Sequence, residues 1–170
     1  DADFVLFWDK DTNLARRLEK SGLPVFNSAK GIALCDDKAK TYIALNGIVN
    51  QPKTLIAPKT YFKADFTQFV EGAIKTLGLP LVFKECFGSF GEQVFLCKSK
   101  AEILSRITEK PFILQEFIAD SAGHDIRIEV VGGKIAAAVR RENKQDFRAN
   151  VTNGGHMEPY TPTDSEVKSA

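Results

Sequence analysis

The start of the chain shows a strand-helix-strand pattern of apolar and polar positions. Residues 4–8 form an unbroken apolar run, and Asp11-Thr12 stands as a helix cap before a segment with apolar positions at helical spacing. Val25 and Phe26 predict a short second strand. We therefore expect residues 1–31 to be the last part of an α/β domain whose earlier strands precede this chain.

Helices dominate the next segment. Asp36 or Asp37 is placed to cap a helix that passes through Leu45, after which the chain becomes extended. Residues 66–77 place apolar side chains along one helical face, and Gly78 follows as a stop signal. This is the clearest helical pattern in the chain.

Two predicted strands, residues 81–84 and 94–97, flank a glycine-containing loop. We call residues 88–91 the glycine loop, because its two glycines make it too flexible for a packed element. Ser99 and Glu102 predict a capping box for the helix that follows. Helix and hairpin together predict a small two-layer unit.

The last third of the chain predicts mainly strands. Residues 112–118 form a buried run, and residues 126–130 alternate apolar and polar positions as in a half-buried strand. Gly132 and Gly133 predict a two-residue hairpin turn into the next strand. Asp164 or Ser165 is placed to begin a final helix that the chain only starts.

Composition narrows the function classes. The chain has 170 residues, 44% of them hydrophobic, and a net charge of +1, so it has no field to gather nucleic acid or an anionic membrane. Its three cysteines lack zinc-site or redox-motif spacing, and no apolar run is long enough to span a bilayer. We expect a soluble cytoplasmic protein with reduced thiols. The sequence leaves open whether it is a monomer or a homo-oligomer.

Lys84 is a candidate phosphate ligand because it lies in an otherwise apolar predicted strand, where an ammonium group loses hydration unless an anion meets it. The alternative is that Lys84 faces solvent at the end of the strand. The glycine loop follows closely, and its backbone N–H groups could close over phosphate oxygens. A short glycine loop also serves as an ordinary hairpin connection.

The polar pair Gln115 and Glu116 interrupts a strand that is otherwise apolar. Backbone groups of residues 115–118 could bind the edge of an adenine ring while Phe117 or Ile118 packs on its face. We call residues 115–118 the hinge segment. The alternative is an amphipathic strand end with Glu116 in water.

Several cations in the last third could neutralise a carboxylate or an acyl phosphate. Asp125 and Arg127 share a face of their strand, and Arg140 shares its face with small alanines that leave room around the guanidinium. Arg148 and Asn150 lie in a loop. The alternative for the strand residues is a solvated charged face whose ion pairs contribute ~0 to 1 kcal/mol each.

The order of these residues resembles the ATP-grasp superfamily, specifically its RimK-like branch of amino-acid ligases. The closest local matches are segments 123–132, 140–141, 146–150 and 154–155. Upstream, Asp37-Lys38 and segments 52–54, 81–84 and 115–118 fall in the family's order, so the resemblance covers nearly the whole chain. Glu92-Gln93 departs from the family, which usually has a further glycine after the loop.

The resemblance implies specific residue roles. The implied ATP-binding residues are Lys38, Lys84, Ser89, Gly91, Gln115, Glu116, Phe117, Ile118 and Asp125. Lys38 and Lys84 would contact the phosphates, the main chain of Glu116 and Ile118 the adenine, and Asp125 the ribose. The implied catalytic residues are Arg140, Arg148 and Asn150, and the implied substrate-binding residues are Arg127 and Arg140.

The resemblance also implies an α+β fold, a partial ATP-grasp fold with two α+β subdomains flanking a nucleotide cleft. Residues 1–31 would be the remnant of the preceding α/β domain, 32–56 a connecting helix and entry, 57–114 the lid subdomain, and 115–170 an incomplete C-terminal subdomain.

The implied activity is an ATP- and magnesium-dependent ligase. It would join an amino-acid, peptide or protein carboxylate to an amine through an acyl phosphate, releasing ADP and phosphate. The magnesium ligands are expected downstream, so we assign no metal ligand in this chain and expect the chain alone to be inactive.

Two other interpretations stay open. One is a non-catalytic nucleotide-binding or regulatory module on the same fold, and the other is an unrelated α+β interaction domain. The sequence identifies neither the carboxylate nor the amine, and it does not show whether the full-length protein has an intact magnesium site. It assigns no role to His156.

Overall fold

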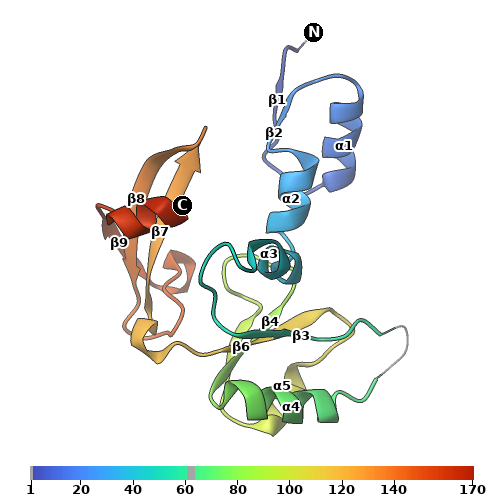
Figure 1. Ribbon diagram of the computed structural model, residues 1–170, viewed down its shortest axis with the longest axis vertical. Helices are drawn as coiled ribbons and strands as arrows, with labels where there is room; N and C mark the ends of the chain where they lie inside the picture. Colours follow the sequence, from blue (N-terminus) through green and yellow to red (C-terminus); the bar gives the residue numbers. More distant parts are fainter. Residues whose placement is uncertain (1, 61–63) are drawn as a thin grey trace.

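The computed structural model describes residues 2–60 and 64–170 (Figure 1). Its N-terminal unit contains β1 (Val5–Leu6), α1 (Thr12–Lys20), β2 (Val25–Phe26) and α2 (Ala29–Cys35), and the two strands pair in parallel. A small core of Phe7, Ala15, Val25, Ala29 and Ile32 holds the unit together. The predicted strand-helix-strand order is confirmed.

Capping residues set the helix starts in this part of the chain. The Asp11 side chain accepts hydrogen bonds from the N–H groups of Asn13 and Leu14 at the start of α1, as predicted. Asp36 and Asp37 were the two candidates for the cap of the next helix, and Asp37 is the N-cap of α3 (Lys38–Leu45). The helix α2 was not predicted, because it is short and carries Gly31 in its interior, which weakens the helical signal.

A four-stranded antiparallel sheet forms the middle of the molecule, in the order β3 (Thr54–Ile56), β6 (Phe112–Glu116), β4 (Leu81–Glu85) and β5 (Val94–Cys97). The helices α4 (Thr67–Leu77) and α5 (Lys100–Arg106) cover one face of it (Figure 1). Val70, Phe83, Ile103 and Leu114 are almost fully buried between these layers. Each such side chain stabilises the fold by roughly 1.5–3 kcal/mol relative to exposure.

Two strands of this sheet, β3 and β6, differ from their predictions. The edge strand β3, which pairs with β6, comes from residues predicted to be extended chain only. The strand predicted over 112–118 ends at Glu116, and the chain then leaves the sheet. Three residues are too few to show a strand period, which explains why β3 was missed.

The predicted capping box of α5 is only half formed. Ser99 accepts a hydrogen bond from the N–H of Glu102, as expected, but the Glu102 carboxylate accepts from the N–H of Lys98 at 2.8 Å instead of that of Ser99. Ser99 therefore caps the helix, while the Glu102 side chain binds the backbone one residue before the cap.

A three-stranded antiparallel sheet follows, with β7 (His124–Val131), β8 (Lys134–Glu142) and β9 (His156–Pro159) in that order. The predicted Gly132-Gly133 turn is confirmed, and both glycines have positive φ angles, of 58° and 73°. Two short 3-10 helices, η1 (Ala119–Ser121) and η2 (Val151–Asn153), lie beside this sheet.

One expectation for this region was wrong. The helix α6 (Asp164–Ser169) is capped by Thr163, with Glu166 completing a capping box, and not by Asp164 or Ser165. The strand β7 has the partly covered apolar face that the period of two predicted, with Ile126 38% exposed and Val130 41% exposed.

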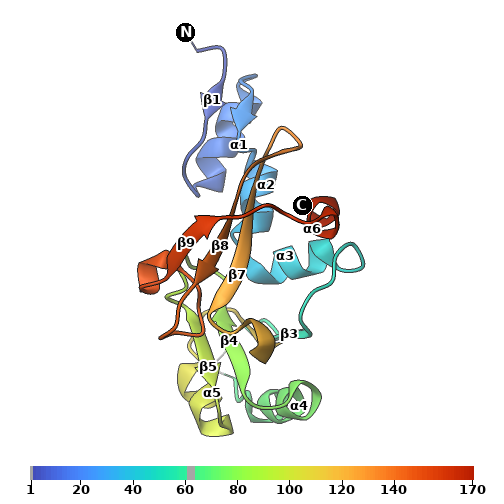
Figure 2. The same cartoon turned by 90° about the vertical axis from the view of Figure 1, so that its left-hand side faces the viewer.

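The two sheets are joined by residues 117–123, and the N-terminal unit lies at the opposite end of the molecule from α4 and α5 (Figures 1 and 2). None of the helices in the described ranges has the length and apolar character needed to cross a membrane.

Candidate functional site

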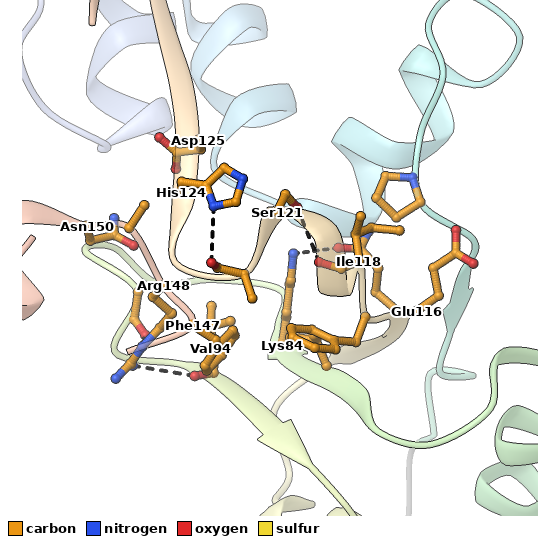
Figure 3. Close-up of a pocket in the computed structure, with 17 residues that line it drawn as sticks. Lys84, Val94, Glu116, Ile118, Ser121, His124, Asp125, Phe147, Arg148 and Asn150 are labelled. Atoms are coloured by element: carbon orange, nitrogen blue, oxygen red, sulfur yellow. Dashed lines mark hydrogen bonds between the residues drawn. The ribbon is translucent and has the colours of Figure 1, made fainter. Parts of the chain in front are cut away.

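A cavity of about 320 Å³ lies where the two sheets meet (Figure 3). Its walls come from β4, the glycine loop, the hinge segment, the start of β7 and the loop at 147–150. Most of the sequence-predicted residues line it together: Lys84, Gly91, Gln115, Glu116, Phe117, Ile118, Asp125, Arg148 and Asn150. Tertiary folding thus brings residues from five separate segments to one site.

Lys84 is a half-buried cation on the cavity wall. Its Nζ donates a 2.6 Å hydrogen bond to Gln115 Oε1, and Gln115 Nε2 donates a 2.8 Å bond to Thr54 Oγ1. Figure 3 shows the Lys84 side chain directed toward the hinge segment. Burial lowers the pKa of Lys84, and the positive charge of Lys38 lowers it further.

No carboxylate in the described ranges lies within ion-pair distance of Lys84. The Lys84 ammonium group is partly buried, and its hydrogen-bond partner is a neutral amide. An anion that enters the cavity would therefore stabilise its charge. The geometry at this position therefore suits a ligand that carries negative charge.

The hinge segment offers backbone groups to a ligand. The N–H of Lys53 bonds the Glu116 carboxylate at 2.7 Å, while the N–H of Glu116 bonds the carbonyl of Lys53 at 2.9 Å. Among the described residues, none accepts a hydrogen bond from the N–H of Phe117 or Ile118. These donors suit an acceptor on a planar heterocycle, with Phe117 and Ile118 supplying apolar surface.

The glycine loop is docked on the segment that follows β8. The carbonyl oxygen of Gly91 accepts a 2.7 Å hydrogen bond from Arg148 Nη1, and the carbonyl of Phe90 lies 3.3 Å from Thr152 Oγ1. Gly91 has φ +80°, and a Cβ there would lie 3.0 Å from Asn150 Oδ1. A larger residue at position 91 would therefore be strained by the positive φ angle and would require the Asn150 side chain to shift.

Arg148 is committed to two partners. Its Nε and Nη2 bond the Asp146 carboxylate, the latter at 2.6 Å, while Nη1 bonds the loop. The bonds from Arg148 hold the pKa of Asp146 below its usual value, and those to Asp146 raise the pKa of Arg148. The sequence did not show that this guanidinium holds the loop.

Asp125 is paired with a residue that the sequence did not assign to the site. Arg141 donates two hydrogen bonds to its carboxylate, from Nε at 2.7 Å and from Nη2 at 2.6 Å. These bonds raise the pKa of Arg141. The two residues are opposite each other in the β7–β8 ladder, so the strand register, once known, would have identified the pair.

Four of the predicted site residues lie outside the cavity wall. Lys38 Nζ lies 3.4 Å from the carbonyl of Cys86 and 3.5 Å from that of Gly88, and burial is the main cause of its lowered pKa. The Ser89 hydroxyl accepts a 2.9 Å hydrogen bond from Lys10 Nζ. The other two, Arg127 and Arg140, are on the exposed three-stranded sheet, near Glu129 and Glu158 respectively.

Some residues that line the cavity were not assigned to the site from the sequence, among them the titratable His124 and the aromatic Phe147. His124 Nδ1 lies 3.2 Å from the carbonyl of Ala122, and Phe147 packs edge-on against Phe117. Both lie beside motif residues that were recognised, so their proximity in sequence was the available signal. In the described ranges, no group of three or more His, Cys, Asp or Glu could hold a metal ion. The expectation that the magnesium ligands lie downstream of this chain stays a prediction.

Comparison with known sequences gives a consistent result. The RimK-like ATP-grasp domain matches residues 35–170. An uncharacterized protein from Mycoplasma pneumoniae, the MG012 homolog, is 35% identical over 98% of this chain and 60% of its own length. A probable alpha-L-glutamate ligase from Maridesulfovibrio salexigens is 32% identical over 92% of this chain and 52% of its own length. The chain thus spans between half and two thirds of the length of these relatives.

The fold is shared with solved ligase structures. The D-alanine–D-alanine ligase from Bacillus anthracis superposes with a TM-score of 0.74 and 18% identity, covering 99% of this chain and 59% of that one. At that identity the likeness concerns the fold, which is mixed α+β as predicted. The family match covers residues 35–170, which is most of the chain, so the chain belongs to the RimK-like ATP-grasp family.

Proposed function

We propose that the whole protein is an ATP-dependent carboxylate–amine ligase, which forms an amide through an acyl phosphate and releases ADP and phosphate. The observation that carries this proposal is the Lys84 ammonium, directed into the cavity beside the hinge segment with a neutral amide as its partner. The family to which the chain belongs supports the same reaction class.

The cavity residues divide into two groups for this role. Phe117 and Ile118 would hold the adenine, by their free N–H groups and apolar side chains, and Asp125 would bind the ribose while Arg141 fixes its carboxylate. Lys84, with Lys38 behind the loop, would attract the phosphates. When bound, ATP supplies the γ-phosphoryl group that activates the carboxylate.

The chain's own part in the reaction is positioning and charge stabilisation. Lys84 would offset the negative charge that develops during phosphoryl transfer, and the glycine loop would exclude water from it. Arg148 and Asn150 lie beside the loop, where they could contact the acyl phosphate. The catalytic role of Arg140 stays a prediction. Its guanidinium lies outside the cavity wall, 5.2 Å from the centroid of the Tyr160 ring.

A screen of amines with the full-length protein tests the proposal. ADP release from ATP would be measured with magnesium present, for wild type, Lys84→Ala, and Lys75→Ala as an exposed control on α4. We expect one amine or a few to stimulate ADP release, and we expect Lys84→Ala to lower that rate at least ~100-fold. Nucleotide binding without any stimulated release would instead favour the non-catalytic module.

A further inference from the structure

Lys10 connects the N-terminal unit to the glycine loop. Its Nζ donates a 2.9 Å hydrogen bond to the Ser89 hydroxyl, across 79 positions of sequence, and it also binds the carboxylate of Asp36. Asp36 lies at the junction of α2 and α3. The ammonium group therefore joins three segments that are distant in the sequence.

Hydrogen bonds to the Asp9 side chain hold the backbone at Lys10 and Asp11. The Asp9 carboxylate accepts the N–H groups of Lys10 at 2.6 Å and of Asp11 at 2.9 Å, and Asp11 in turn caps α1. This turn lies beyond the carboxyl end of β1, one of two parallel strands. Such strand ends are where α/β units usually present functional side chains.

The glycine loop is thus held from two sides. Arg148 holds Gly91 from the C-terminal side, and Lys10 holds Ser89 from the N-terminal side. The loop has three positive φ angles, at Gly88, Phe90 and Gly91. A segment with such a backbone depends on outside contacts to keep one conformation.

We propose that Lys10 is a positioning residue: held by Asp36, it fixes Ser89 and so sets the position of the glycine loop over the nucleotide phosphates. The effect on nucleotide binding rests on the proposed function, whereas the effect on the loop does not. Lys10 is also close enough to Lys38 for their charges to interact. A direct charge effect of Lys10 on the phosphates is therefore the competing explanation.

A double-mutant cycle separates the two explanations. The dissociation constants of ADP and AMP would be measured with the full-length protein for wild type, Lys10→Ala, Ser89→Ala and the double variant. We expect Lys10→Ala to weaken ADP binding about 3- to 10-fold and to leave AMP binding nearly unchanged. We expect no added loss when Ser89 is already alanine. A full Lys10→Ala effect in the Ser89→Ala background would overturn the positioning role.

Hydrogen exchange of the free protein tests the contact without any nucleotide. In Lys10→Ala, amides of residues 87–93 should exchange several-fold faster than in wild type, whereas Lys20→Ala, an exposed control on α1, should match wild type. Lys10→Arg should restore most of the protection. If the wild-type protein binds no ADP, the proposed function fails. Hydrogen exchange still tests the contact between Lys10 and the glycine loop. Unchanged exchange of residues 87–93 in Lys10→Ala would refute the positioning role.

Discussion

Arg148 Nη1 donates a 2.7 Å hydrogen bond to the carbonyl oxygen of Gly91 and so ties the glycine loop to the segment that follows β8. The remaining donors of the same guanidinium bind Asp146, which neutralises its charge. One side chain thus holds two walls of the cavity together.

Replacing Arg148 by lysine should open the loop, because an ammonium group cannot bond Asp146 and Gly91 in the same forked geometry. We expect the free energy of unfolding to fall by about 1–3 kcal/mol. Amides near Gly91 should exchange faster in a hydrogen-exchange measurement. Arg16→Lys, at an exposed position on α1, is the matched control. Equal exchange at the loop in both variants would contradict this role.

Lys84 should make stability depend on alkaline pH. Its pKa is lower in the folded state than in the unfolded chain, so the folded state binds fewer protons between the two values. The destabilisation from its buried charge is complete below the folded pKa and is relieved as the pH rises toward the ordinary lysine value. Urea unfolding should therefore show that Lys84→Met stabilises the protein most at neutral pH, with the advantage shrinking as the pH rises toward the ordinary lysine pKa. An advantage that is constant with pH would argue against a buried ammonium at position 84.

Gly123 should tolerate no side chain, for a steric reason separate from its φ angle. A Cβ there would lie 2.3 Å from the carbonyl oxygen of Asn143, and both backbone groups of Gly123 are hydrogen-bonded to the loop over residues 143–147. Gly47 has the same φ of +75° and open space around it, so Gly47→Ala is a matched control. We expect Gly123→Ala to be less stable than Gly47→Ala by roughly 1–3 kcal/mol or more in chemical unfolding. Similar losses in both would show that only the φ angle matters.

Replacing Gln93 by an apolar residue of similar shape should stabilise the folded protein. In the described part of the chain Gln93 Oε1 is buried with no hydrogen-bond partner, and it lies against Gly88. Methionine has a similar shape and no buried acceptor, so Gln93→Met should raise the free energy of unfolding by about 1 kcal/mol. Gln68→Met, on the exposed face of α4, should show little change. A destabilised Gln93→Met variant would indicate that the amide has a partner in solution.

Elements whose signal lies within a few neighbouring residues could be predicted from the amino-acid sequence alone. The apolar period of residues 66–77 fixed α4, the Asp11 cap fixed the start of α1, and Gly132-Gly133 fixed the β7–β8 turn. These features depend on neighbours within a few residues, so a local pattern is sufficient to predict them. The order of motifs was specific enough to indicate the family.

The partners of the site residues follow from the packing of distant segments, which no local pattern shows. The pairing of β3 with β6, the Arg141–Asp125 pair, and the contacts of Lys10 and Arg148 with the glycine loop all join segments distant in sequence. A side chain's type shows what it can bind, but its direction and its nearest partner follow from how the sheets and loops pack. That is why Arg148 could be predicted near the site while its bond to Gly91 could not.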